Sequence, residues 1–240
     1  MSTRRETAPT IALARRRLRA LSNRDDAAFL QRFFKTRAGE YGAGDRFLGI
    51  RVPTTRRLAR EFRALPLVDV VALLHEPWHE ARLLALMLLV ARFERGTAAE
   101  RREVYRVYLA NTARINNWDL VDASASNIVG AYLEGRSRAP LDRLARSQSL
   151  WERRVAIIAT FWYIRRGDYD DTLRIVERLL GDGEDLLHKA CGWMLREVGK
   201  RDRVVLESFL SRHARAMPRT MLRYAIEKMT PEDRQHWMHR

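Results

Sequence analysis

Apolar residues recur three and four positions apart from Asp25 onward, a spacing that places them on one face of an α-helix. Glycine, proline or short polar clusters interrupt this pattern, and no segment alternates strictly as a strand would. The predicted helices span residues 25–35, 53–64, 67–75, 78–94, 98–113, 118–134, 141–146, 150–166, 169–180, 186–200, 204–216 and 219–228, with a short tail after Pro231. The loops between them are short, as between antiparallel neighbours. The sequence therefore predicts an all-α protein.

Four amphipathic helices carry polar anchors at a nearly constant spacing. Arg82, Trp118, Arg154 and Trp193 are separated by 36, 36 and 39 residues. This period is typical of HEAT-like two-helix repeats, in which each repeat buries its apolar face only by stacking on its neighbours. Chance spacings of this size also occur in all-helical proteins. We expect a right-handed curved solenoid of HEAT-like two-helix repeats, with equivalent helices lining one surface.

Domain boundaries are not marked by any linker-like stretch, which favours one domain over residues 24–240. Residues 1–23 are predicted to be a basic N-terminal extension, partly helical or disordered. Within it, residues 12–19 form a basic amphipathic stretch that could contact an anionic surface or simply be a solvated helix end.

The longest non-helical segment, residues 36–52, contains four glycines. A loop of this length is either functional or flexible. The glycine spacing matches neither a Walker loop nor a dinucleotide-binding motif, and no strand precedes it. Nucleotide binding is therefore not predicted here. Tyr41 lies in this loop and is a second-tier candidate for a DNA contact.

The net charge of +15, from 45 Lys and Arg against 30 Asp and Glu, points to a polyanionic partner. An Arg-rich composition could also raise the net charge without any function. The distribution of the basic residues along the chain must distinguish these two explanations. A single cysteine, Cys191, excludes an internal disulfide and suits a reducing compartment. No segment is apolar enough to cross a membrane or resembles a signal peptide. We expect a cytoplasmic protein.

A basic and aromatic surface would result if the second helix of each repeat faced the same side. Such a surface would hold Arg82, Trp118, Asp122, Arg154, Trp193 and Arg196. Arginines bind phosphates in a bidentate manner and tryptophans offer flat surfaces to sugars or bases. Asp122 would weaken the binding of a polyanion, which indicates a chemical role. The alternative is that Trp118 is a packing residue and Asp122 a solvated or ion-paired one.

Trp118 and Asp122 lie one helical turn apart on one face, whereas Asp119 points elsewhere and suits the helix N-terminus after Asn116 and Asn117. The remaining candidates have simpler interpretations. His75, His79, His188 and His236 form no ligand-like cluster and are expected to be exposed or capping residues, so no metal is predicted. We expect packing roles for Cys191, Trp78, Trp151 and Trp162.

Several segments resemble the AlkD-like family of alkylpurine DNA glycosylases. They are FFKTRAGEYGAGDRFLGIRVPTTRR, RINNWDLVDASASNIVGAYL, LWERRVAIIATFWYI, HKACGWMLREVGKRD and PRTMLRYAIEKM, in the family's order. The resemblance covers most of the chain apart from about the first 23 residues, and WDLVD together with KACGWMLRE is its specific part. It implies a HEAT-like solenoid that excises cationic N3- or N7-alkylated or bulky alkylated purines from duplex DNA, without a base-flipping pocket.

The resemblance also implies roles for particular residues. Trp118, Trp193 and Asp122 would meet the deoxyribose of the lesion, and Asp122 would carry the chemistry. Arg154 would lie near a neighbouring phosphate, and the expected DNA contacts are completed by Arg196, Lys189, Arg82 and Arg51. No cofactor is implied, and a monomer is the default expectation.

The chemistry that the resemblance implies is physically consistent. Cleavage of an N-glycosidic bond leaves an oxocarbenium-like sugar, whose growing positive charge a nearby carboxylate stabilises selectively. A cationic alkylpurine leaves as a neutral base and needs no general acid, so one carboxylate suffices. No lysine is obviously placed for Schiff-base chemistry, which indicates a monofunctional glycosylase of base excision repair. The alternatives are a non-catalytic protein that binds damaged or branched DNA, and a HEAT-type scaffold for acidic proteins.

Overall fold

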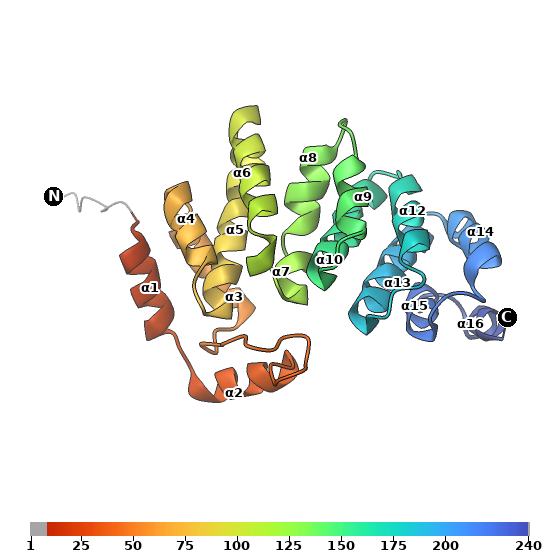
Figure 1. The fold of residues 1–240 in the computed structure, drawn as a ribbon, viewed down its shortest axis with the longest axis horizontal. Coiled ribbons are helices and arrows are strands. Elements are labelled where there is room, and N and C mark those ends of the chain that lie inside the picture. Colours follow the sequence, from red (N-terminus) through yellow and green to blue (C-terminus); the bar gives the residue numbers. More distant parts are fainter. Residues whose placement is uncertain (1–8, 240) are drawn as a thin grey trace. The chain divides into compact units, whose positions relative to one another are not determined.

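The protein is described here from a computed structural model, which covers residues 9–239 (Figure 1). The first helix begins at Ile11, and the described residues contain no β-strand, only an isolated bridge between Arg46 and Trp78. The prediction of an all-α protein is confirmed. Residues 1–8 of the predicted N-terminal extension lie outside the described residues. The chain divides after Ser124 into two compact units, which are described separately as the N-terminal and the C-terminal unit.

The helices of the N-terminal unit pack around α5. They are α1 (Ile11–Ala20), α2 (Arg24–Phe33), α3 (Val52–Glu61), α4 (Leu67–Leu74), α5 (His79–Arg95), α6 (Ala98–Ala110), the short 3₁₀ helix η1 (Thr112–Arg114) and α7 (Trp118–Asp122). Helix α5 contacts α3, α4, α6 and α7, and it is buried along most of its length. Its leucines are all buried, and Leu84, Leu86 and Leu89 are completely enclosed. Helix α5 is therefore the centre of this unit.

Helix α1 includes the basic amphipathic stretch whose role the sequence left open. It packs on α4 and α5 through Ala14 and Leu18, both of which are buried. Two of its arginines are paired with acids of other helices: Arg15 with Glu76 at 2.6 Å and Arg17 with Glu61 at 3.2 Å. The apolar face of this stretch is thus used for packing within the unit.

The glycine-containing loop between α2 and α3 is anchored by the first turn of α5. The carboxylate of Glu80, 1% exposed, accepts hydrogen bonds from the backbone amides of Leu48, Gly49 and Ile50 at 2.8–3.1 Å. Gly49 has a φ of +82°, and a Cβ atom there would lie 2.0 Å from the carbonyl oxygen of Asn23. Only glycine fits this position. One buried carboxylate thus fixes a loop that has no regular structure.

The C-terminal unit is a second set of packed helices. It contains the π-helical turn η2 (Ser126–Gly130), α8 (Ala131–Leu133), α9 (Ala139–Ala145), α10 (Leu150–Ala159), α11 (Phe161–Ile164), α12 (Asp170–Arg178), α13 (Asp185–Gly199), α14 (Arg203–His213), α15 (Arg219–Ala225) and α16 (Pro231–Met238). Helix α10 packs on α9 and α13, and α13 packs on α14 and α15. Stacking in chain order within each unit is what a repeat architecture predicts.

Helices α13 and α15 approach each other closely at Gly192. A Cβ atom at this position would lie 2.4 Å from the carbonyl oxygen of Met221 and 2.5 Å from the Cβ atom of Tyr224. Cys191 and Met194, on the same helix as Gly192, are completely buried. Burial raises the pKa of the Cys191 thiol, which agrees with the packing role expected for this residue.

The single helix predicted over residues 118–134 is divided in the structure. Helix α7 ends at Asp122, and the π-helical turn η2 precedes α8. The hydroxyl of Ser124 donates to the carbonyl oxygen of Leu120 at 2.6 Å and contacts the hydroxyl of Tyr108 at 3.0 Å. Serine and threonine hydroxyls compete for helical carbonyls in this way, a local effect that apolar periodicity does not report.

Candidate functional site

Helix α7 carries two of the residues predicted to act on the sugar, and Asn117 defines its start. The side-chain oxygen of Asn117 accepts from the backbone amide of Trp118 at 2.9 Å, and its amide donates to the Oδ2 atom of Asp45 at 2.8 Å. Asn117 is completely buried. The first turn of α7 is therefore tied to the loop between α2 and α3.

The indole of Trp118 is half-buried at the edge of an aromatic cluster. It stacks on Phe34 with ring centroids 5.1 Å apart and an interplanar angle of 18°. Phe33 meets it edge-on at 6.0 Å and is itself 53% exposed. Stacked and edge-on contacts of this kind restrain a ring without enclosing it. Trp118 is thus held in place with part of its surface accessible.

Asp122 closes α7 and is half-buried. Its electrostatic effect on the N-terminal unit is visible at Tyr108, which is completely enclosed. Burial raises the pKa of the Tyr108 hydroxyl, and the charge of Asp122 raises it further. The carboxylate of Asp122 therefore lies within electrostatic range of the neutral Tyr108 hydroxyl.

Behind α7 lies a buried network of charged side chains that the sequence did not reveal. His79, the first residue of α5, is 2% exposed. Its Nδ1 atom lies 3.0 Å from the Oδ2 atom of Asp45, and its Nε2 atom lies 2.8 Å from the Oδ2 atom of Asp119. Both ring nitrogens face carboxylates, so both donate in the protonated form. The expectation that His79 is an exposed or capping residue is wrong.

The charges in this network stabilise one another. Burial lowers the pKa of His79, but the charges and hydrogen bonds of Asp119 and Asp45 outweigh it and raise the pKa to about 9. For Asp45, burial raises the pKa, and the hydrogen bond from His79, the charge of Arg82 and the hydrogen bond from Asn117 lower it to about 2. At neutral pH the network is an imidazolium held by two carboxylates.

Arg82 belongs to this network. Its side chain is buried, pairs with Asp45 and donates to the side-chain oxygen of Asn116. The guanidinium is thus already engaged by two protein groups. These contacts suit a role for Arg82 in holding Asp45 in place. The phosphate contact of Arg82 stays a prediction.

Asp119 has two partners, one of which the sequence anticipated. Its Oδ1 atom accepts from the backbone amide of Leu120 at 2.9 Å, as suits a carboxylate at a helix N-terminus. Its Oδ2 atom binds His79, which the sequence did not indicate. The relevant signal was the i, i+3 pair of His79 and Arg82 at the start of a leucine-rich helix, because polar residues buried there need partners.

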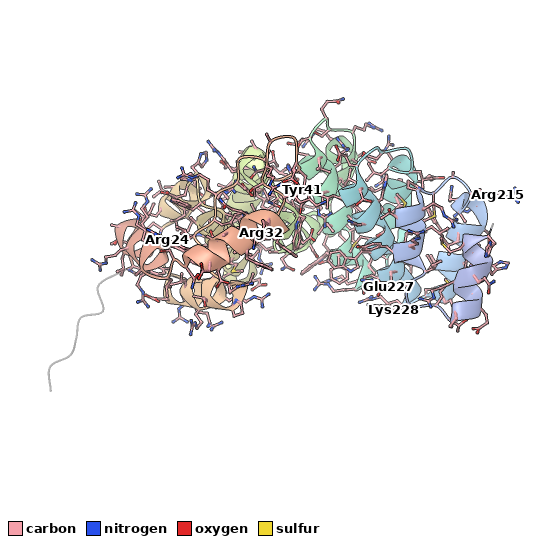
Figure 2. The ribbon with its side chains drawn as sticks, turned by 90° about the horizontal axis from the view of Figure 1, so that it is seen from below. Arg24, Arg32, Tyr41, Arg215, Glu227 and Lys228 are labelled. Atoms are coloured by element: carbon pink, nitrogen blue, oxygen red, sulfur yellow. The ribbon has the colours of Figure 1, made fainter. Side chains whose placement is uncertain are left out.

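The two remaining candidates of the N-terminal unit lie near α2. Arg51 is exposed, pairs with Asp26, and has its guanidinium carbon 5.0 Å from the Phe29 ring centroid. The hydroxyl of Tyr41 lies 3.5 Å from the carbonyl oxygen of Phe33. Figure 2 shows Tyr41 in the loop that follows α2, together with Arg24 and Arg32 on that helix. Arg51 and Tyr41 are thus accessible side chains around the exposed aromatic residues of α2.

The C-terminal unit contains Trp193, Arg154, Arg196 and Lys189. Trp193 is half-buried on α13, with its ring centroid 6.0 Å from that of Phe161. Arg154 is 5% exposed, and its Nη1 atom donates to the carbonyl oxygen of Leu186 at 2.6 Å. Arg196 pairs with Glu227, and Lys189 with Asp185 at 2.7 Å. These cations have protein partners, so each phosphate contact would compete with an existing interaction.

The described part of the chain has neither a metal-binding cluster nor a membrane-spanning helix. No group of three or more histidine, cysteine, aspartate or glutamate side chains is arranged to hold a metal ion within residues 9–239. Over the same range, none of the helices has the length and apolar character that a membrane crossing requires.

Comparison with known proteins agrees with this picture. The model of the DNA alkylation repair enzyme family matches residues 14–229. The chain belongs to this family. The match begins within α1, so it includes part of the predicted extension. Membership gives the chain a role in DNA repair, as the resemblance implied. No curated protein matches the sequence.

A solved structure shows the fold. A protein described as a predicted DNA alkylation repair enzyme from Enterococcus faecalis superposes with a TM-score of 0.68. The similarity covers 88% of this chain and 97% of the other, at 18% sequence identity. At this identity the likeness concerns the fold alone.

Proposed function

We propose that this DNA repair enzyme is a monofunctional glycosylase that excises N3- or N7-alkylated, cationic purines from duplex DNA. Asp122 is the catalytic carboxylate, and Trp118 and Trp193 flank the sugar. The observation that carries this proposal is the geometry of α7, where a half-buried carboxylate lies one turn after a half-buried, stacked indole. A cationic sugar fits between such groups, because both the carboxylate and the π face attract positive charge.

The buried network supports this role for α7. Asn117 and Asp119 bind Asp45 and His79, which hold the start of the helix. A catalytic carboxylate stabilises a transition state best when its support is fixed in advance, because no free energy is then spent on reorganisation. His79 and Asp45 are therefore positioning residues, since their contacts with Asp119 and Asn117 hold the first turn of α7.

The proposed reaction requires little from the protein. A purine alkylated at N3 or N7 carries a positive charge, so rupture of the C1′–N bond moves the bonding electrons onto the base and releases it neutral. Positive charge develops on the sugar, where Asp122 stabilises it, and water then adds to C1′ and loses a proton. The products are the free alkylpurine and an abasic site. No general acid is needed, in contrast to ordinary glycoside hydrolysis.

The decisive experiment measures the release of free alkylbase from methylated duplex DNA by the wild-type protein and by Asp122→Asn. The variant keeps the size of the side chain and removes its charge. Glu103→Gln, an exposed carboxylate of α6 in the same unit, is the matched control. Binding to a duplex with an unreactive abasic analogue is measured in parallel.

We expect Asp122→Asn to lose most excision, roughly a hundredfold or more as for other charge-stabilising groups, with affinity for the analogue retained. Glu103→Gln should match the wild type. Unchanged excision in the Asp122 variant would remove this residue from the mechanism. Tight binding without any release by the wild type would favour the alternative, a non-catalytic protein that binds damaged or branched DNA.

A further inference from the structure

Three side chains of the C-terminal unit converge on the ring of Phe161, the first residue of α11. The Trp193 ring centroid lies 6.0 Å from that of Phe161. The guanidinium carbons of Arg165 and Arg201 lie 4.9 and 6.0 Å from the same centroid. Phe161 therefore connects the predicted sugar-contacting tryptophan with two arginines that the sequence analysis did not single out.

Arg165 is held by rings. Besides Phe161, its guanidinium carbon lies 5.3 Å from the Trp162 ring centroid, and its Nη2 atom donates to the Ser126 hydroxyl at 3.3 Å. Aromatic faces restrain the planar guanidinium while leaving donors at its edge. The residue is nevertheless exposed. Arg165 thus presents a preorganised set of hydrogen-bond donors to solvent.

Arg165 differs from its basic neighbours in its lack of an acidic partner. Arg166 pairs with Glu134 at 2.8 Å, and Arg201 pairs with Glu197 at 3.1 Å. Within residues 9–239, no carboxylate forms an ion pair with Arg165. Partial burial lowers the pKa of Arg165, and the charges of Arg166 and Arg201 lower it further. An anion placed here would remove this repulsion between like charges.

Extending the glycosylase function proposed above, we propose that Arg165 and Arg201 form a phosphodiester-binding subsite of the DNA interface, beside the Trp193 ring. The planar donor pair of Arg165 matches two phosphate oxygens, and such charge-assisted pairs are among the stronger hydrogen bonds. Arg201, whose guanidinium carbon lies 6.0 Å from the Phe161 ring centroid, adds a second positive charge. The subsite orients the DNA backbone so that the sugar meets Trp193.

A second basic region of the same unit provides a built-in control. An open groove between α9 and α12 is lined by Arg143, Arg146, Arg174 and Arg178, together with Asp142 and Ala139. Arg143 is exposed there, like Arg165, but has no aromatic frame in the described structure. Its replacement removes the same charge from the same unit. Nonspecific attraction of DNA would therefore weaken equally in both variants.

The test compares Arg165→Gln with Arg143→Gln by fluorescence anisotropy on a duplex with an unreactive abasic analogue. Titrations are repeated over a series of salt concentrations, and circular dichroism verifies that both variants are folded. We expect Arg165→Gln to bind about tenfold more weakly, with a log–log salt slope shallower by about 1, because one phosphate contact is lost. Arg143→Gln should stay within about twofold of the wild type, because a solvated charge contributes little.

Three results would overturn the subsite. Equal loss in the two variants would mean that only net charge matters, and loss in Arg143→Gln alone would put the phosphate in the α9–α12 groove. Wild-type affinity of Arg165→Gln would also reject it. Failure of the glycosylase proposal is seen separately, as absence of base release by the wild-type protein while it binds the analogue duplex.

Discussion

The Nε2 atom of His79 lies 2.8 Å from the Oδ2 atom of Asp119, and this contact joins the first residue of α5 to the second residue of α7. The other ring nitrogen binds Asp45 in the loop between α2 and α3. Three segments that are distant in sequence thus meet at one imidazole. The first turn of α7, which carries Trp118, is therefore held by an imidazole that has no chemical role in the proposed mechanism.

The coupling between His79 and Asp119 can be measured by a double-mutant cycle. We expect His79→Asn and Asp119→Asn each to lower the free energy of unfolding by about 3 kcal/mol, because each leaves a buried charge without its partner. The double variant should lose less than the sum, since the two changes remove the same interaction. Urea unfolding followed by circular dichroism gives the three values. His75→Ala, an exposed histidine in the same unit, is the control; strict additivity would show that the pair is not coupled.

Stability should fall on the alkaline side of neutrality. The pKa of His79 is raised from 6.5 to about 9 in the folded protein, so the folded state binds this proton more tightly than the unfolded chain. The stabilisation is complete below pH 6.5, declines as the pH rises toward 9, and is absent above it. Urea midpoints across this range should fall for the wild type and change less for His79→Asn. Parallel curves for the two proteins would mean that His79 is neutral when folded.

Gly192→Ala should destabilise the C-terminal unit. The added methyl group would lie 2.4 Å from the carbonyl oxygen of Met221, so α13 and α15 would have to separate. We expect a loss of about 2–3 kcal/mol in the free energy of unfolding, as for other overpacked sites. Gly183→Ala is a suitable comparison, because a Cβ atom there has open space around it. Equal unfolding midpoints for the two variants would show that the helices accommodate the methyl group.

Removal of the Trp118 ring should affect excision. Trp118→Ala deletes one aromatic face next to the proposed cationic sugar, and a cation–π contact of about 0.5–2 kcal/mol corresponds to a loss of roughly 2- to 30-fold in rate. Excision of a methylated purine under single-turnover conditions measures the effect. Unfolding curves run alongside separate it from loss of the stacking on Phe34. A rate equal to that of the wild type would place the sugar elsewhere.

The sequence predicted the helical fold and the start of α7 at Trp118, because apolar periodicity is a local signal. Asp122 and Trp118 stood out for the same reason, since their separation of one turn is visible along the chain. The partnership of His79 with Asp45 and Asp119 joins residues 34 and 40 positions apart. Nothing in local spacing reports such a contact. The division of the helix after Asp122, where the hydroxyl of Ser124 donates to the carbonyl oxygen of Leu120, was also missed.

The three amide hydrogens held by Glu80 have a consequence for the motion of the α2–α3 loop. Leu48, Gly49 and Ile50 belong to no helix, yet their amides point into a buried carboxylate rather than into solvent. Exchange with deuterated water requires that this carboxylate first be released, and an uncompensated buried charge makes that opening rare. We therefore expect the amides of Leu48, Gly49 and Ile50 to exchange slowly, like those of a buried element and unlike those of an exposed loop.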